Sequence, residues 1–214
     1  SHYLKHLYVH PYHTIYSNIK TLPPAHQLIV RDGKVTIKKY WDLPSQNLKI
    51  GMDDAEKEFK RLFTLAVEKQ MIADYPVGAF LSGGIDSSTV VAVASQFTKQ
   101  LKTFSFGFGE EINELPFAKE VSDMYSTNHI ELVDKNEDIG DLLVSMQSIY
   151  DEPFADSSNI PTYLISKYAS KHFKVVLTGD GGDELLAGYS WYKNILETPG
   201  MHPEVSSKAY FLNV

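Results

Sequence analysis

Two short stretches of this sequence combine glycines, hydroxyl groups and carboxylates in an order that suits phosphate chemistry. Residues 82–88 read Ser-Gly-Gly-Ile-Asp-Ser-Ser and follow an apolar run of strand length at 77–81. Residues 179–184 read Gly-Asp-Gly-Gly-Asp-Glu and follow a second apolar run at 173–178. A helical pattern comes after each stretch, so both have the order strand, glycine turn, helix start.

The first stretch is suited to holding an anion. The leading backbone N–H groups of a helix lack partners and carry partial positive charge. Glycines at the turn let a phosphate approach the main chain without meeting a side chain, and serine hydroxyls add donors. We therefore expect phosphate contacts from Ser82, Gly83, Gly84, Ser87 and Ser88.

The first stretch is not the common P-loop, because it lacks the Gly-Lys-Ser/Thr ending. Asp86 stands inside it instead. A carboxylate beside phosphates is repelled unless a cation lies between them. Mg²⁺ prefers carboxylate and phosphate oxygens, so the pattern indicates a Mg²⁺ site at Asp86. The structural alternative is a tight strand-to-helix turn with a serine cap.

The second stretch places Asp180, Asp183 and Glu184 among three glycines. Acids at a helix N-terminus are stabilised by the helix dipole, which gives a purely structural explanation. Three acids at a strand's carboxyl end also suit a second metal-binding wall, and we expect Asp183 to belong to it.

Alternating strands and helices must position these stretches. Strands are expected at 77–81, 101–109, 128–134 and 173–178, and the helices between them begin near 86, 114, 136 and Pro161. This alternation predicts an α/β fold, an open parallel sheet with helices on both faces. Ligands of such sheets sit beyond the carboxyl ends of the strands, here near 105–107 for the second strand.

A further amphipathic helix is expected from a cap at Asp53 or Asp54 to about Ile72. Its apolar face would be Phe59, Leu62, Phe63, Ala66 and Val67. Similar faces are expected for the helices at 86–97 (Val90, Val91, Ala94, Phe97), 114–125 (Ala118, Val121, Tyr125) and 136–149 (Ile139, Leu142, Leu143, Met146).

Residues 1–50 differ from the rest. The segment 27–41 predicts a β-hairpin that turns at Asp32-Gly33, and we expect it to belong to a larger sheet because a lone hairpin is marginal in water. The segment 3–16 has no clear periodicity, and its histidines suit packing or a metal site. Residues 43–47 read as a linker. The acidic loop 150–161 suits either a helix cap or a wall of the substrate site.

Composition excludes several classes of protein. The 214 residues carry a net charge of -7, which argues against a broad nucleic-acid footprint. The absence of cysteine excludes disulfides, zinc–thiolate sites and a cysteine nucleophile in this chain. There is no apolar run of membrane-span length and no signal-peptide pattern, so we expect a cytoplasmic protein without membrane partners.

These motifs resemble a known family. Residues 82–88 resemble the pyrophosphate loop of the N-type ATP pyrophosphatases (PP-loop), and residues 178–189 nearly match the second signature of the glutamine-hydrolysing asparagine synthetases. Residues 150–161 resemble the Asp-Glu-Pro segment of that family, and 21–44 the end of its glutaminase domain. The resemblance implies an adenine nucleotide alpha hydrolase-like fold. It also implies a glutaminase-domain end at 1–44 and a synthetase domain at 45–214, shortened at its C-terminus.

The resemblance also implies an activity. ATP would be cleaved between its α and β phosphates as a carboxylate, that of aspartate, becomes an acyl-adenylate, which ammonia from glutamine then converts to an amide. Asp86 and Asp183 would hold Mg²⁺ and Asp180 would complete the catalytic set. The residues implied in nucleotide binding are Leu81 and Phe106 at the adenine, Ser82, Gly83, Gly84, Asp86, Ser87 and Ser88 at the pyrophosphate, and Gly179 and Asp180 at the α-phosphate.

Two departures from the family pattern limit this expectation. The glutaminase nucleophile of the family is an N-terminal cysteine, which this chain lacks, and the late helical region of the family is missing or shortened. Alternatives on the same fold are a β-lactam synthetase, a lasso-peptide cyclase, or a sugar or cell-wall amidotransferase. A non-catalytic nucleotide-binding relative is an alternative of another class. A homodimer is possible.

Overall fold

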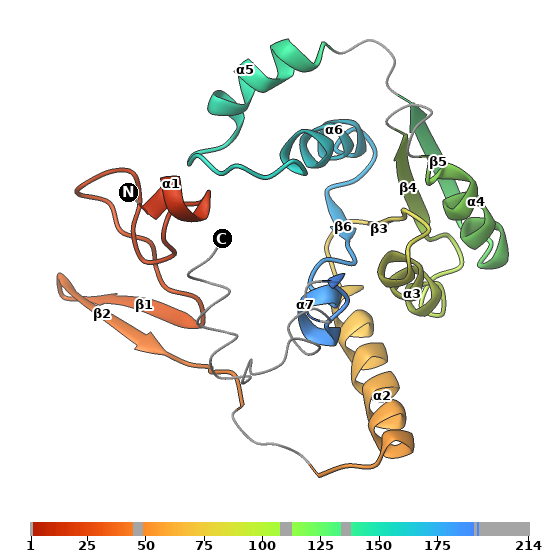
Figure 1. Cartoon of the computed structure of the whole chain (residues 1–214). Helices are drawn as coiled ribbons and strands as arrows, with labels where there is room; N and C mark the ends of the chain where they lie inside the picture. Colours follow the sequence, from red (N-terminus) through yellow and green to blue (C-terminus); the bar gives the residue numbers. More distant parts are fainter. Residues whose placement is uncertain (1, 45–48, 108–112, 134–137, 191, 193–214) are drawn as a thin grey trace, which may run out of the picture.

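A parallel β-sheet forms the centre of the molecule (Figure 1). In this computed structural model the described residues are 2–44, 49–107, 113–133, 138–190 and 192. Strands β3 (Val77–Phe80), β4 (Lys102–Gly107), β5 (Asn128–Val133) and β6 (Val175–Leu177) lie in the order β5-β4-β3-β6 and are all parallel. The predicted open parallel α/β sheet is confirmed.

Helices cover both faces of this sheet (Figure 1). Helices α2 (Met52–Gln70), α3 (Ile85–Ala94) and α4 (Leu115–Met124) pack on one face, and α6 (Asn159–Ala169) packs on the other, with α5 (Ile139–Ile149) against α6. Side chains alternate along β3 and the residue that follows it: Ala79 and Leu81 join the core under α2, α3 and α4, whereas Phe80 joins the core under α6. This period of two is what a strand buried on both faces requires.

Helix α2 differs from its prediction. It begins at Met52 with Gly51 as N-cap, so neither Asp53 nor Asp54 is the cap; both lie in the first turn, where they suit the helix dipole. Of the predicted apolar face, Val67 is buried and Phe63 partly buried. Phe59, Leu62 and Ala66 are exposed. The reason is that α2 covers only the margin of the sheet, beside α3.

Other helix faces are confirmed in part. Val90, Val91 and Ala94 are buried, but α3 ends at Ala94 and leaves Phe97 exposed. On α4, Ala118 is buried and Val121 packs against the same core, whereas Tyr125 is exposed. On α5, Leu142 and Met146 are buried while Ile139 and Leu143 are exposed, because α5 packs on α6 and not on the sheet.

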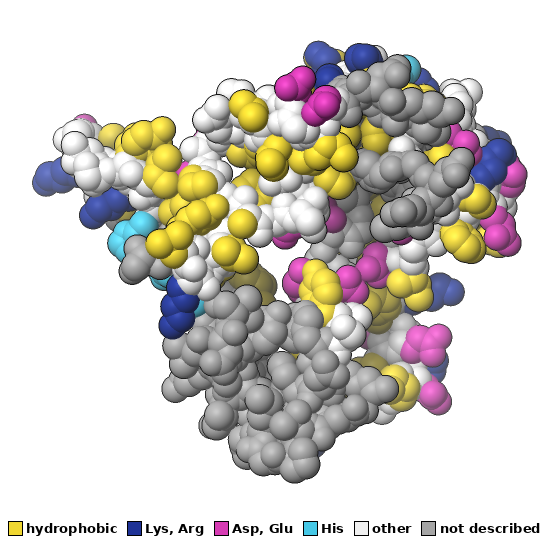
Figure 2. Space-filling view, turned by 45° about the horizontal axis from the view of Figure 1, so that its top comes forward, with side chains coloured by type: hydrophobic (Ala, Val, Ile, Leu, Met, Phe, Trp, Pro, Cys, Tyr) yellow, Lys and Arg dark blue, Asp and Glu magenta, His cyan; other side chains and the backbone are white. Residues whose placement is uncertain are grey.

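The N-terminal part contains a helix that the sequence did not predict, α1 (His2–His6), and the predicted hairpin. Strands β1 (His26–Arg31) and β2 (Lys34–Lys39) pair through a turn with positive φ at Asp32 (50°) and Gly33 (74°). The prediction that this hairpin belongs to a larger sheet is wrong for the described residues, because its two strands pair only with each other there. Their apolar side chains are exposed, and hydrophobic groups gather on this side of the molecule (Figure 2).

Some predictions fall on residues that the structure does not describe. These are the linker residues 45–47, the strand ends at 108–109 and 134, the helix start at 136–137, and the tail 197–214. The predicted division into domains at 44 and 45 stays a prediction. None of the described helices combines the length and the apolar character needed to cross a membrane.

Candidate functional site

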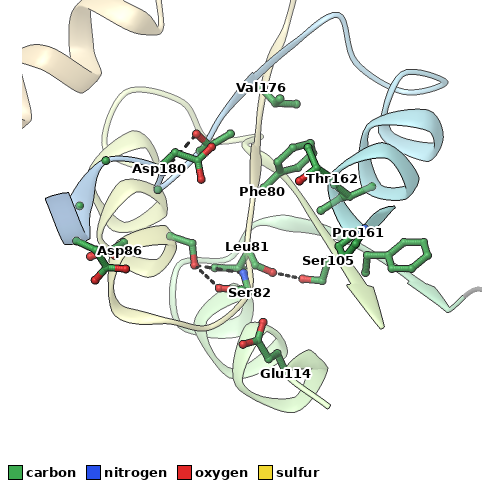
Figure 3. Close-up of a pocket in the computed structure, with 18 of the residues that line it drawn as sticks. Phe80, Leu81, Ser82, Asp86, Ser105, Glu114, Pro161, Thr162, Val176 and Asp180 are labelled. Carbon is green, nitrogen blue, oxygen red and sulfur yellow. Dashed lines mark hydrogen bonds between the residues drawn. The ribbon is translucent and has the colours of Figure 1, made fainter. Parts of the chain in front are cut away.

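A pocket of about 820 Å³ opens at the carboxyl ends of β3, β4 and β6 (Figure 3). The chain builds the sheet outward from β3 through β4 to β5 and then returns to place β6 on the other side of β3. Such a switch point is where open parallel sheets bind ligands. The predicted site residues that line the pocket are Leu81, Ser82, Asp86, Ser87, Phe106, Gly179, Asp180 and Asp183.

The first loop is held by its own serines. The Ser82 N–H donates to Ser87 Oγ (3.2 Å), and Ser87 Oγ donates to the Gly84 carbonyl (3.2 Å). The two serine hydroxyls lie 3.0 Å apart, and the Gly84 N–H donates to Ser82 Oγ (3.2 Å). These bonds tie the end of β3 to the start of α3, so the loop has a defined shape before any ligand binds.

Three predicted phosphate-binding residues, Gly83, Gly84 and Ser88, do not line the pocket. Gly83 has φ +84°, and a side-chain carbon there would come within 2.5 Å of Phe117 Cβ. Its freedom from a side chain therefore serves packing against the start of α4. Ser88 Oγ is buried and has no hydrogen-bond partner among the described residues. A buried hydroxyl without a partner costs free energy.

The second loop packs directly on the first. A side-chain carbon at Gly179 would lie 2.8 Å from the Ser87 backbone nitrogen, and one at Gly182 would lie 2.6 Å from Asp86 Cγ. Only glycine permits this approach. The loop ends in helix α7 (Gly182–Leu186), which begins before the two acids and so carries Asp183 and Glu184 in its first turn.

A tyrosine that the sequence analysis missed holds one of these acids. Tyr189 lines the pocket, and its hydroxyl donates to Glu184 Oε1 at 2.7 Å. This hydrogen bond lowers the pKa of the Glu184 carboxyl and raises the pKa of Tyr189 to about 12. Glu184 is therefore held as an anion at the rim of the site. The spacing of five residues gave no recognisable signal, because the αL backbone of Ala187 (φ 57°) creates the contact.

Leu81 and Phe106, the residues predicted to contact adenine, both line the pocket. Leu81 is buried, and its N–H donates to the Phe104 carbonyl (2.9 Å), which continues the β3–β4 ladder past β3. The ring of Phe106 stacks on Tyr168 at a centroid distance of 5.8 Å. Ser105, within the predicted ligand region at 105–107, lines the same pocket, as do Glu114 and Thr162, which were not predicted.

The charged residues that line the pocket, within the described part of the chain, are all acidic: Asp86, Glu114, Asp180, Asp183 and Glu184. A polyphosphate could occupy such a site only with cations. The described residues contain no group of three or more side chains arranged to enclose a metal ion. Asp86 and Asp183 nevertheless fit Mg²⁺, because this ion commonly takes one or two carboxylates and completes its shell with phosphate and water.

The acidic loop 150–161 contributes little to the pocket. Asp156 Oδ1 accepts bonds from the Ser158 N–H (2.8 Å) and Ser158 Oγ (2.6 Å), which lower the pKa of Asp156. Glu152 Oε1 accepts from the N–H of Ile15 in the N-terminal segment (3.3 Å). Pro161, in the first turn of α6 as predicted, is the member of this loop that lines the pocket. Ser158 is the N-cap of α6, where no side chain makes a capping hydrogen bond. Asp156 therefore orders the turn that precedes the helix, which favours the structural interpretation of this loop over a wall of the pocket.

Comparison with known proteins identifies a family. The family model described as asparagine synthase matches residues 58–211. A putative asparagine synthetase [glutamine-hydrolyzing] 2 of Methanocaldococcus jannaschii is 44% identical over 188 residues, covering 86% of this chain and 36% of the relative. Asparagine synthetase [glutamine-hydrolyzing] 1 of Bacillus subtilis is 37% identical over 185 residues, covering 86% and 29%.

Two further similarities are more distant. Human asparagine synthetase [glutamine-hydrolyzing] is 30% identical over 194 residues, covering 85% of this chain and 30% of the human protein. A solved structure of NH3-dependent NAD synthetase from Campylobacter jejuni aligns with a TM-score of 0.42 and 17% identity, over 63% of this chain and 60% of that one; a likeness this slight does not bear on function. The chain spans about a third of the length of the curated relatives. On the family model and these identities, the chain belongs to the asparagine synthase family.

Proposed function

We propose that the protein is an ATP-dependent, amide-forming ligase of the asparagine synthetase kind. The carboxylate of aspartate would attack the α-phosphorus of ATP, the bond to the bridging oxygen would break, and pyrophosphate would leave. Ammonia derived from glutamine would then attack the acyl carbon of the adenylate, a proton would be lost, and AMP would depart. The names of the relatives support this class of reaction. The lining of the pocket supports the proposal that a nucleotide binds there.

The observation that carries this proposal is the contact between the two glycine loops. Gly179 and Gly182 bring the second loop against Ser87 and Asp86 at the switch point of the sheet. One face of the pocket then offers serine hydroxyls and a helix N-terminus to phosphates, and the other offers carboxylates. With the phosphate-binding groups on one face and the carboxylates on the other, the pocket suits a metal ion held between carboxylates and phosphates. A reaction that releases pyrophosphate needs such an ion.

The chain's own residues would bind and orient the reactants. Ser82, Ser87 and the start of α3 would hold the pyrophosphate, and Leu81 and Phe106 would line the adenine site. Asp86 and Asp183 would hold Mg²⁺, which would neutralise charge as pyrophosphate forms. Gly179 and Asp180 would lie at the α-phosphate and the substrate carboxylate. Catalysis here is mainly orientation and charge neutralisation.

The parts of the protein beyond this site belong to the same proposal. Residues 1–44 would be the end of a glutaminase domain, with 45–214 in the synthetase domain. A cytoplasmic location and a homodimer are further expectations. Production of asparagine from aspartate and ammonia would separate this function from those of sibling amidotransferases and cyclases.

Calorimetric titration of ATP, with and without Mg²⁺, tests the proposal in the full-length protein and in Asp86→Asn. Binding should require Mg²⁺ and weaken by about tenfold or more in the variant, since a carboxylate ligand is lost. Asp54→Asn is the matched control, because Asp54 lies in the first turn of α2, outside the pocket. Metal-independent binding, or equal binding by both variants, would contradict the assignment.

A further inference from the structure

Behind the pocket lies a row of buried polar side chains on strands β4 and β5 and on helix α4. Thr103 and Ser105 of β4 and Ser122 of α4 are almost fully buried, and the side chain of His129 on β5 is 5% exposed. Buried hydroxyls and imidazoles are retained in a core when their hydrogen bonds are satisfied. The register of the sheet sets Thr103 opposite His129 and Ser105 opposite Glu131, so the imidazole lies between the two hydroxyls of β4.

The hydrogen bonds of this row fix the tautomer of His129. The Thr127 hydroxyl donates to Ser122 Oγ (3.0 Å), so Thr127 Oγ1 must accept from Thr103 Oγ1 (2.8 Å). Thr103 has only one proton to give, and its oxygen therefore accepts from His129 Nδ1 at 2.9 Å. Neutral His129 consequently carries its proton on Nδ1.

The other ring nitrogen then faces acceptors. His129 Nε2 lies 3.4 Å from Ser105 Oγ and 3.6 Å from Glu131 Oε1, and the Ser105 hydroxyl already donates to the Leu81 carbonyl (Figure 3). In the neutral ring no proton lies between Nε2 and these oxygens. Ser105 can turn its proton toward Nε2 only by releasing Leu81. Protonation of the ring reverses this: Nε2–H donates to Ser105, whose own proton stays on the Leu81 carbonyl.

Leu81 joins the buried row to the pocket. It is the residue between β3 and Ser82, and both Leu81 and Ser105 line the pocket. The Ser105–Leu81 bond therefore sets the main chain from which the first glycine loop departs. An imidazolium behind that loop would also attract an anion in the pocket.

We propose that His129 is a positioning residue: its protonation locks Ser105 onto the Leu81 carbonyl and strengthens binding of a nucleotide polyphosphate at the first loop. This inference rests on the proposed function for its ligand, but the proton arrangement at His129 does not depend on it.

The charged groups around His129 define the pH range. Burial lowers the pKa of His129 below its ordinary value of 6.5; Glu131 on β5 and Asp123 on α4 act to raise it, and Lys119 on α4 acts to lower it. Protonation therefore occurs below pH 6.5, and polyphosphate binding should tighten as the pH falls through that range. By linkage, a bound polyphosphate should raise the pKa of the His129 ring.

Nitrogen NMR of the imidazole rings in the unmodified protein tests the proton arrangement, with the His129 signal assigned by its loss in His129→Gln. Protonation of Nδ1 in the neutral ring is the expected result. Thr103→Val should abolish this preference, and Ser105→Ala should lower the pKa of the ring, because the imidazolium loses an acceptor. A neutral ring protonated on Nε2 would overturn the inference.

Two variants separate the two nitrogens in nucleotide binding. The amide of Gln lies near the Nε2 position and that of Asn near Nδ1, so His129→Gln can donate to Ser105 whereas His129→Asn can bond only to Thr103. Because the pKa of His129 is lowered, calorimetry with Mg·ATP should run from neutral pH down to the lowest pH at which the protein stays folded, and it should show a severalfold gain in affinity for the unmodified protein as pH falls. At every pH, His129→Gln should bind Mg·ATP with the affinity that the unmodified protein has at low pH, and His129→Asn with the affinity that it has at high pH. These two affinities should differ about three- to tenfold. ATP changes its own protonation with pH, but this change is the same for every protein. The ratio of the affinities of two proteins at one pH is therefore free of it.

The outcomes distinguish the two proposals. Equal affinities of the Gln and Asn variants, or an unmodified protein whose pH dependence matches theirs, would overturn the role of His129 while leaving the proposed function intact. A protein that binds no nucleotide at any pH would defeat the proposed function. In that case the tautomer and its response to Ser105→Ala still decide whether His129 orients Ser105.

Discussion

The carboxylate of Asp86 lies against the backbone of Gly182: a side-chain carbon added at Gly182 would come within 2.6 Å of Asp86 Cγ. Asp86 lies in the first turn of helix α3 and Gly182 begins helix α7, so the two glycine loops share a single contact surface. The position of the Asp86 carboxylate therefore depends on a residue far away in the sequence.

Replacement of Gly182 by alanine should displace the Asp86 carboxylate. We expect Mg²⁺-dependent ATP affinity to fall about ten- to a hundredfold, because small displacements of a positioned group cost factors of this size. Calorimetry measures the change. Gly51→Ala is the matched control, since nothing lies within 4 Å of the carbon it adds. Unchanged affinity in Gly182→Ala would show that the loop contact does not position Asp86.

Gly83 should be sensitive to substitution for two separate reasons. Alanine there would adopt a left-handed backbone (φ +84°), at about 1–2 kcal/mol, and would collide with Phe117 and the Ala118 nitrogen, adding about 1–3 kcal/mol. Gly181→Ala carries the same backbone strain (φ +92°) without a neighbour within 4 Å. Denaturant unfolding should therefore find Gly83→Ala the less stable of the two. Equal losses of stability in Gly83→Ala and Gly181→Ala would mean that α4 moves away from the added carbon without a cost in free energy.

Loss of the Tyr189 hydroxyl should raise the pKa of Glu184. The hydrogen bond depresses the pKa of that carboxyl in the folded state, so its stabilisation is present above the unfolded pKa and disappears as the pH falls through the folded value. At the alkaline end, it is lost as the pH rises through the Tyr189 pKa of about 12. The unfolding free energies of the unmodified protein and Tyr189→Phe should therefore converge in acid.

Carboxyl NMR titration of Glu184 and denaturant unfolding at several pH values check this expectation. Tyr40→Phe is the control, because Tyr40 is exposed on the N-terminal segment, outside the pocket. A Glu184 titration that does not move in Tyr189→Phe would be incompatible with the hydrogen bond at 2.7 Å.

Asp156 should order the turn before α6 and not act as a substrate ligand. Asp156→Ala removes two bonds to Ser158 at the start of α6 and should destabilise the protein by about 1 kcal/mol. The loss should shrink as the pH falls through the lowered pKa of Asp156. Nucleotide affinity should stay unchanged in calorimetry. A drop in affinity without a drop in stability would restore the substrate-wall interpretation of loop 150–161.

Much of the fold follows from local sequence. Apolar runs separated by helical periodicity predict the four parallel strands, and the glycine turns after β3 and β6 mark the site. These signals are local, because strand pairing and helix formation each need only a short stretch with the right period. Predictions failed where burial depends on a neighbour: Phe59 and Leu62 have the spacing of a core face, yet α2 covers only the margin of the sheet.

Local sequence is enough to single out the candidate residues of the site: Asp86 with its serines, and Asp180 and Asp183 among glycines. Which of them meet depends on the folded chain, because the pairing of β6 with β3 brings Gly182 against Asp86. The tertiary structure likewise decides that His129 lies between Thr103 and Ser105, since that contact depends on the register of β4 and β5. Long-range pairing of this kind is set by the sum of many packing contacts, which no short stretch of sequence contains.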